Sequence, residues 1–242
     1  MLTYKTITDK GNREINEDSI RYAEHDGTHC FIVADGLGGH GKGDEASSVV
    51  CDKIIECFKS YSGNAKDFIG EAIEKAQSVL LEEQEKRAAK YQMKTTLVIL
   101  VIDGKTAYWG HVGDSRLYYF SKGRFKLRTI DHSVPQMLVL AKSIKEKEIR
   151  HHPDRNKLLR VLGITWERPM YELNSTELKL NGKQAFLLCT DGFWELVEDK
   201  EMQSFLRKSK TVTEWLDAMT EKVIENGKDE NMDNYSAIAI IV

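Results

Sequence analysis

Turn dipeptides between apolar segments place the strongest constraint on how this 242-residue chain can fold. Asp26-Gly27, Asp103-Gly104 and Asn181-Gly182 each separate two strand-like segments. Such dipeptides favour the positive φ angles of tight type I′ hairpin turns. Lys122-Gly123 marks a further turn of the same kind. Because a tight hairpin joins neighbouring antiparallel strands, we predict largely antiparallel sheets and not a doubly wound parallel sheet.

Three stretches have the periodicity of amphipathic helices. In the first, apolar residues recur at helical spacing from Ala46 to Phe58. The second is expected to begin after Asn64 as its N-cap, and the short connection predicts that these two helices pack antiparallel. The third is expected to begin at Thr211, with Thr211 and Glu214 forming a capping box. This order of strands and helices indicates an α+β protein in which helix pairs cover β-sheets.

The composition is that of a globular domain. Hydrophobic residues make up 41% of the chain, charged residues 30%, and the formal net charge is −3, which argues against nucleic acid as the main partner. The N-terminal segment lacks the apolar stretch of a secretory signal, and the longest apolar run, Leu97 to Ile102, is too short to span a membrane. We therefore expect a cytoplasmic protein with free thiols and no membrane partner. The scattered cysteines are Cys30, Cys51, Cys57 and Cys189.

Two segments share the pattern of an apolar run followed by Asp-Gly. FIVADG ends at Asp35-Gly36, and FLLCTDG ends at Asp191-Gly192. Each apolar run carries a carboxylate toward buried surroundings, where an unpaired anion is costly. No Lys or Arg lies beside either aspartate in the sequence. The pair therefore predicts a divalent metal site, and with it a metal-dependent hydrolase.

Further acids lie at expected strand ends. They are Glu17, Asp18, Asp114 and Asp233. Taken alone, each could be an ordinary turn or cap acid. Together they extend the candidate site, because loops at strand ends carry function and all-oxygen ligand sets select Mg²⁺ or Mn²⁺ over zinc.

The segment DGLGGHGKG resembles two nucleotide-binding patterns. Gly36, Gly38 and Gly41 fit the G-x-G-x-x-G spacing of dinucleotide sites, but the expected antiparallel sheets exclude that fold. A phosphate-binding Walker loop is excluded as well, because Gly43 stands where a metal-binding Ser or Thr is needed. We interpret the segment as a tight turn whose glycines let the backbone approach a metal closely.

In these residues the chain closely resembles the metal-dependent Ser/Thr protein phosphatases of type 2C, in their compact bacterial form. The resemblance rests on eight blocks that occur in the family's order and span almost the whole chain. The blocks are RxxNED at Arg13–Asp18, VADGLGGHGKGDEAS at Val33–Ser47, TT at Thr95-Thr96, HVGDSRLYY at His111–Tyr119, DHS at Asp131–Ser133, RNKLLRVLG at Arg155–Gly163, LLCTDGFWE at Leu187–Glu195 and DNYS at Asp233–Ser236.

The resemblance implies a four-layer α-β-β-α sandwich of two mainly antiparallel sheets flanked by helix pairs. Residues 1–242 would form a single catalytic domain, with a mobile flap at about 135–163. It also implies hydrolysis of phosphoserine and phosphothreonine in proteins, by a metal-activated water at a binuclear centre. The ions would be Mn²⁺ or Mg²⁺, with a third, weaker one as in bacterial members.

By this resemblance Asp35 would bridge both metals, and the carbonyl of Gly36 would bind one of them. Asp191 and Asp233 would hold the other ion. Asp114 would join Asp191 in holding the third ion.

Three further residues complete the implied site. Glu17 and Asp18 would act through metal-bound waters. Arg13 would grip the substrate phosphate, since a guanidinium can bind phosphate oxygens bidentately. The alternative for Arg13 is a surface salt bridge with Glu14 or Glu17.

Some positions depart from the family pattern. Lys94 replaces a usual glycine before Thr95, and Lys142-Ser143 replaces a usual glycine in the flap. Leu37 stands where eukaryotic members carry a proposed general-acid histidine, which leaves solvent as a candidate proton donor to the leaving group.

Two other functions stay open at this point. One is a catalytically weak pseudophosphatase that binds phosphoproteins, although the intact acids argue against it. The other is a hydrolase of small phosphoesters. As a protein phosphatase, the chain would act as a monomer on phosphoproteins and reverse the work of a cognate Ser/Thr kinase, whose identity the sequence does not contain.

Overall fold

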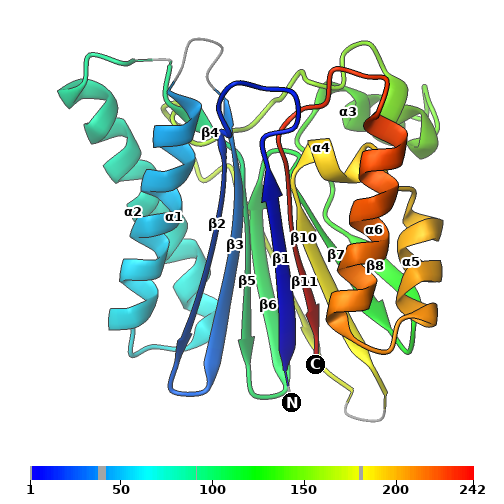
Figure 1. The fold of residues 1–242 in the computed structure, drawn as a ribbon. Helices are drawn as coiled ribbons and strands as arrows, with labels where there is room; N and C mark the ends of the chain where they lie inside the picture. The colour runs from blue at the N-terminus through cyan, green and yellow to red at the C-terminus, as the bar shows by residue number, and fades with distance from the viewer. Residues whose placement is uncertain (1, 38–41, 91, 180–181) are drawn as a thin grey trace.

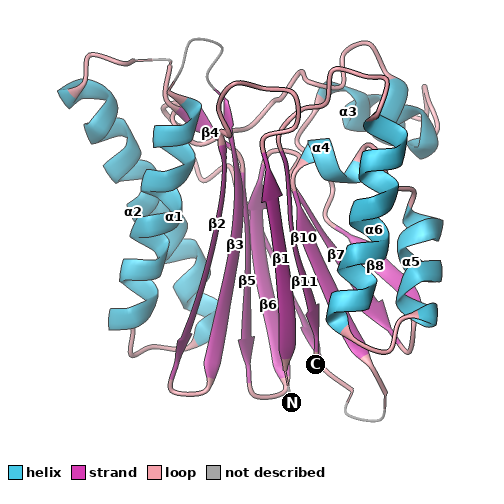
Figure 2. Cartoon of the chain, viewed as in Figure 1, coloured by secondary structure: helices cyan, strands magenta, loops and turns pink. Residues whose placement is uncertain are grey.

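Two antiparallel sheets pack face to face, and helices cover the outer face of each sheet (Figures 1 and 2). The computed structural model describes residues 2–37, 42–90, 92–179 and 182–242. Every strand pairing in these residues is antiparallel. The predicted four-layer α-β-β-α sandwich of the α+β class is therefore confirmed.

The two sheets draw their strands from distant parts of the chain. The five-stranded sheet has the order β1 (Thr3–Asp9), β11 (Tyr235–Ile241), β10 (Gln184–Cys189), β7 (Arg116–Ser121) and β8 (Arg124–Arg128). The six-stranded sheet has the order β2 (Asp18–His25), β3 (Thr28–Leu37), β5 (Leu97–Asp103), β6 (Thr106–Val112) and β9 (Glu172–Glu177), with β4 (Lys94–Thr95) paired to β3.

Three of the four predicted turns join paired neighbouring strands, β2 to β3, β5 to β6 and β7 to β8. Asp26 and Lys122 have φ angles of 48° and 53°, as tight turns of this type require. The expected fourth hairpin is wrong. Asn181 lies outside the described residues, but β9 and β10, on either side of it, belong to different sheets. Both edges of β10 are already occupied, by β7 and β11, so no edge is left for β9.

Two helices cover each outer sheet face. Helices α1 (Gly43–Ser60) and α2 (Ala65–Lys86) lie on the six-stranded sheet, while α5 (Asp199–Lys208) and α6 (Val212–Gly227) lie on the other (Figure 1). A short helix, α4 (Asp191–Trp194), follows β10. Between β8 and β9 run α3 (Val134–Leu140) and the 3₁₀ helix η1 (Glu146–His151), inside the segment expected to form the flap.

The predicted helix starts are close to those observed. The Asn64 side chain accepts a hydrogen bond from the Asp67 backbone N–H at 2.9 Å, which confirms it as N-cap. Thr211 Oγ1 likewise accepts from the Glu214 N–H at 3.1 Å. Glu214 Oε2 instead accepts from the backbone of Lys210, so only half of the expected capping box forms.

Three apolar clusters hold the layers together. Between the sheets lie residues such as Phe31, Leu100 and Phe186, all fully buried. The second cluster joins the six-stranded sheet to α1 and α2, and the third joins the other sheet to α5 and α6. The four cysteines are free, and three of them are buried, as expected. None of the described helices is long and apolar enough to cross a membrane.

The catalytic candidates gather at one end of this sandwich. Strands β2 and β11 begin, and β1 and β3 finish, at the end opposite the two termini (Figure 1). Asp18 and Asp35 face each other across β2 and β3 at this end. Asp233 lies just before β11, and Asp191 begins α4 directly after β10. The two sheets therefore bring together carboxylates that lie more than 200 residues apart in the chain.

Candidate metal centre

A cleft of about 660 Å³ opens at this end of the sandwich. Every predicted site residue except Asp18 lines it. The lining residues are Arg13, Glu14, Ile15, Glu17, Asp35, Gly36, Leu37, Lys94, Asp114, Asn156, Leu158, Asp191, Asp233 and Asn234. Apart from Asp18, the acids at the predicted strand ends thus share one cavity.

Asp18 and Asp35 are each held by a hydrogen bond with a threonine hydroxyl from a distant part of the chain. Thr190 Oγ1 donates to Asp18 Oδ2 at 2.9 Å, and the backbone N–H of Asp35 donates to Thr96 Oγ1 at 3.0 Å. Asp18 is buried, and its Oδ1 has no hydrogen-bond partner within the described part of the chain. A buried carboxylate oxygen without a partner is costly, so this atom is available to a cation or to a water bound to one.

Asp191 connects the two sheets' carboxylates. Its carboxylate interacts electrostatically with that of Asp35, and its Oδ1 accepts a hydrogen bond from the Gly192 N–H at 2.6 Å. The next residue must be small, because a Cβ on Gly192 would lie 2.1 Å from the Asn234 carbonyl oxygen. This close approach brings α4 against the segment that enters β11, where Asp233 lies.

The electrostatics of the cluster favour protons or cations. Burial raises the pKa of Asp18 to about 7, with neighbouring aspartates adding to the shift. Burial, followed by the negative charge of Asp191, raises the pKa of both Asp35 and Asp114 well above the ordinary value. Burial and Asp233 likewise raise the pKa of Asp191. Carboxylates so close together cannot all be ionised without a compensating positive charge. An all-oxygen donor set with this deficit of cations fits hard divalent ions.

Gly36 is required by close backbone packing. A Cβ at this position would lie 2.2 Å from the carbonyl oxygen of Gly43 and 2.6 Å from that of Glu17. Its N–H donates to the Glu17 carbonyl at 3.1 Å, while Glu17 Oε1 accepts from the Gly43 N–H at 3.2 Å. Glycine therefore lets β3, the start of α1 and the Glu17 loop meet at the cleft. Gly38 and Gly41 of the same segment lie outside the described residues.

Arg13 lies in the cleft and pairs with a metal-ligand candidate. Its Nη2 is 2.9 Å from Asp233 Oδ2, and both side chains are roughly half exposed. This finding corrects the alternative expected for Arg13, because its ion-pair partner is neither Glu14 nor Glu17 but Asp233. The sequence hides this pair because its members are 220 residues apart.

Asp114 is 4% exposed and lies between β6 and β7. Its carbonyl oxygen accepts a hydrogen bond from Trp194 Nε1 at 3.0 Å. The guanidinium of Arg116 stacks 3.3 Å from the centre of the Trp194 ring and forms a bidentate pair with Asp131, at 2.6 and 2.8 Å. This buried framework fixes the main chain of Asp114 relative to α4.

Sequence reasoning missed several residues that build the cleft. Asn234 Oδ1 accepts from the Glu17 N–H at 2.8 Å, and its Nδ2 donates to the carbonyls of Lys10 and Ile15. Asn234 thereby ties the N-terminal loop to the start of β11. The only hint of this role in the sequence was its position directly after Asp233. Lys94, noted only as a departure, lines the cleft with no ion-pair partner among the described residues.

Comparison with known families identifies the class of protein. The family model described as Protein phosphatase 2C matches residues 10–234. The chain belongs to the protein phosphatase 2C family.

Several members of this family are similar to the chain over nearly its full length. The serine/threonine phosphatase stp of Listeria monocytogenes is 28% identical over 232 residues, which are 93% of this chain and 91% of that protein. The structure of Stp1 from Staphylococcus aureus superposes with a TM-score of 0.90 at 28% identity, covering 100% of this chain and 95% of that one. The catalytic domain of PstP in complex with two manganese ions gives a TM-score of 0.84 at 25% identity, covering 100% and 98%.

Proposed function

We propose that the carboxylate cleft is a manganese- or magnesium-dependent centre at which this protein hydrolyses phosphoserine and phosphothreonine in other proteins. The chain is a protein serine/threonine phosphatase by family membership. The observation that carries the site assignment is the group of buried aspartates with raised pKa values, of which Asp35, Asp114 and Asp191 line the cleft and Asp18 has an unpartnered carboxylate oxygen. The PstP catalytic domain, a similar fold, is known with two manganese ions.

The residues present fit two divalent ions, and a third weaker one. Asp35 and the Gly36 carbonyl would hold one ion, Asp35, Asp191 and Asp233 the second, and Asp114 with Asp191 the third. Glu17 and Asp18 would act through coordinated water. Bound there, such ions lower the pKa of water and neutralise charge on a transferring phosphoryl group.

The chain's own side chains then bind and orient the substrate. Arg13 is paired with Asp233. A cation held by Asp233 would share the negative charge of this carboxylate, which would leave the Arg13 guanidinium available to a phosphate. Lys94 adds a second positive charge to the lining of the cleft. With the apolar Leu37 also in the lining, we assign protonation of the leaving serine or threonine to solvent.

We further infer a single catalytic domain over residues 1–242, with residues 135–163 as a flap beside the cleft. Asn156 and Leu158 of this segment line the cleft, which supports a role in contacting substrate. The protein would act in the cytoplasm, as a monomer, against a cognate Ser/Thr kinase.

A panel of substrates tests this proposal. Phosphoserine, phosphothreonine and phosphotyrosine peptides of one sequence should be compared with small phosphoesters at saturating Mn²⁺, with phosphate release as the readout. We expect the phosphoserine and phosphothreonine peptides to have the highest kcat/KM. A marked preference for a small phosphoester would favour the small-molecule hydrolase, and binding of phosphopeptides without turnover would favour the pseudophosphatase.

A further inference from the structure

One histidine, His132, hydrogen-bonds both the N–H and the carbonyl of Gly113, the residue before Asp114. The Gly113 N–H donates to His132 Nδ1 at 3.2 Å, and the His132 N–H donates to the Gly113 carbonyl at 2.9 Å. Gly113 has a φ angle of 98°, and a Cβ there would lie 2.7 Å from Thr96 Cγ2. The backbone immediately before Asp114 therefore has a conformation that other residues rarely adopt, and His132 fixes it from both sides.

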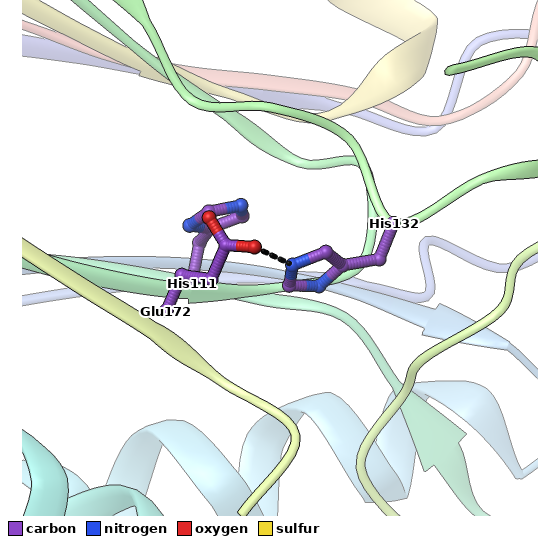
Figure 3. A group of neighbouring side chains, drawn as sticks. All are labelled: His111, His132 and Glu172. Atoms are coloured by element: carbon purple, nitrogen blue, oxygen red, sulfur yellow. Dashed lines mark ion pairs between the residues drawn. The ribbon is translucent and has the colours of Figure 1, made fainter. Parts of the chain in front are cut away.

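The other ring nitrogen of His132 faces the start of β9 and the flap segment. Nε2 lies 3.3 Å from Glu172 Oε1 (Figure 3). The Arg160 guanidinium is 3.3 Å from the same nitrogen. The His111 ring stacks on His132, with 4.6 Å between ring centres and 17° between planes. The His132 ring is thus held from three directions, and only its Nδ1 edge acts on the Asp114 turn.

The tautomer of His132 decides whether this cluster binds a metal ion or instead holds the Asp114 turn through hydrogen bonds. Nitrogen and oxygen atoms of His111, His132 and Glu172 lie within 4.8 Å of one another, a spacing that would also suit a metal ion. However, Nδ1 of His132 accepts the Gly113 N–H, so the neutral ring carries its proton on Nε2, 3.3 Å from Glu172 Oε1, and offers no lone pair there to a metal. The positive guanidinium of Arg160 occupies the same space. Burial, with His111 and Arg160 nearby, lowers the pKa of His132 to about 3, so the ring stays neutral.

We propose that His132 is a positioning residue, which orients the carboxylate of Asp114 toward the third ion and links that carboxylate to the flap. This inference rests on the proposed function of Asp114. The lone pair of His132 Nδ1 holds the Gly113–Asp114 backbone in the conformation needed for binding. Trp194 holds the carbonyl of Asp114 from the other side, so the two contacts together leave the turn little freedom.

The flap meets the same histidine through the backbone. The Leu159 N–H donates to the His132 carbonyl at 2.8 Å, and Ser133 and Leu158 form an isolated antiparallel bridge. Leu158 in turn lines the catalytic cleft. A substrate that presses on Leu158 therefore acts on a segment bonded directly to the residue that sets the Asp114 turn. Position of the flap and binding of the third ion become linked through His132.

Two substitutions distinguish the hydrogen bond made by His132 Nδ1 from the contacts made by Nε2. The amide oxygen of His132→Asn can replace Nδ1 as acceptor for Gly113, whereas His132→Gln places its amide near Nε2 and loses the Gly113 bond. His132→Phe keeps the ring volume and loses both. Each variant should be compared with wild type by calorimetric titration of Mn²⁺ into the metal-free protein, by turnover on a phosphothreonine peptide, and by melting temperature.

We expect His132→Asn to bind the weak Mn²⁺ ion within about threefold of wild type. His132→Gln and His132→Phe should weaken that site, and lower turnover, by roughly tenfold or more, which is typical of losing a residue behind a metal ligand. The two tighter ions should bind as in wild type in all three variants. If His132 were needed only for packing, the variants would rank by side-chain volume. His132→Phe would then retain the most Mn²⁺ affinity, turnover and melting temperature, and His132→Asn the least. That result would overturn the inference.

Asp114→Ala separates failure of this inference from failure of the proposed function. It should remove the weak site altogether. If Asp114→Ala binds the weak ion as wild type does, both the third-ion assignment and the role of His132 are wrong. If Asp114→Ala removes the ion, but Mn²⁺ affinity in the His132 variants depends only on side-chain volume, then only the role of His132 is wrong. Should His132→Phe fail to fold, the difference between Asn and Gln still decides the matter.

Discussion

Arg13 Nη2 lies 2.9 Å from Asp233 Oδ2, so the residue assigned to the substrate phosphate is paired with a residue assigned to a metal. The pair joins the N-terminal loop to the start of the last strand. An ion pair this exposed contributes at most about 1 kcal/mol to stability. Its position in the cleft therefore indicates a role in binding.

Replacing Arg13 should affect substrate binding more than the fold. Arg13→Ala removes charge-assisted hydrogen bonds to phosphate, each worth about 1.5–3 kcal/mol. KM for a phosphopeptide should rise roughly tenfold or more, with melting temperature and Mn²⁺ affinity little changed. Steady-state kinetics at saturating Mn²⁺ measure this, with Arg13→Lys as a control that keeps the charge. An unchanged KM together with a lower melting temperature would identify a merely structural salt bridge.

Removing one charge from the cluster should stabilise the metal-free protein, and more so at higher pH. The folded-state pKa of Asp191 is raised, so wild type gains stability from its proton at low pH and loses it as pH rises through that pKa. Asp191→Asn has no such loss. Urea unfolding in chelator should show a small difference near pH 4.5 and a gain of about 1 kcal/mol or more near pH 8, since one pKa unit is about 1.4 kcal/mol. A variant less stable than wild type at pH 8 would contradict the electrostatic reading. His111 and His132 titrate alike in both proteins and cancel in the difference.

Asp114 should behave as a ligand and not as a turn acid. Its buried carboxylate is repelled by Asp191, so Asp114→Ala should leave the metal-free protein as stable as wild type, or slightly more stable. Turnover on phosphopeptides should fall, and additional Mn²⁺ should not restore it. Thermal melts in chelator and Mn²⁺-dependent kinetics check both parts. A clearly destabilised variant with normal turnover would show that Asp114 only closes the turn between β6 and β7.

Lys94 should assist the capture of phosphorylated substrates. It lines the cleft without an ion-pair partner among the described residues, and a phosphate dianion is attracted by such a charge. Lys94→Met should lower kcat/KM for phosphopeptides roughly two- to tenfold at low salt, and the deficit should shrink as ionic strength rises. Lys94→Arg is the control that should retain most activity. A loss of kcat/KM that does not change with ionic strength would mean that Lys94 acts through packing.

Local sequence patterns predicted the hairpins and helix starts well, because their determinants lie within a few residues. The Asp26-Gly27 turn and the Asn64 cap depend only on neighbouring backbone. The segment around Asn181 was misread because strand pairing also depends on distant competitors, and β7 and β11 occupy both edges of β10.

The site residues were likewise predictable where the signal was local and not where it depended on distant contacts. Its acids were identifiable because each follows or precedes an apolar strand, and the family blocks ordered them. The contacts that position the acids were not visible, since Trp194 reaches Asp114 across 80 residues and Asn234 reaches Glu17 across 217. Such contacts depend on how the sheets pack, which no local pattern contains.

Metal dependence is the most direct test of the whole mechanism. Protein stripped of metal with excess chelator should be assayed on a phosphothreonine peptide before and after Mn²⁺ is added back, beside Asp35→Asn treated in the same way. We expect no measurable turnover without metal, full recovery of wild type with Mn²⁺, and a turnover in Asp35→Asn lower by roughly 10²–10³ even at saturating Mn²⁺. Full activity of the metal-stripped wild type, or wild-type turnover in Asp35→Asn, would contradict a metal centre built on these aspartates.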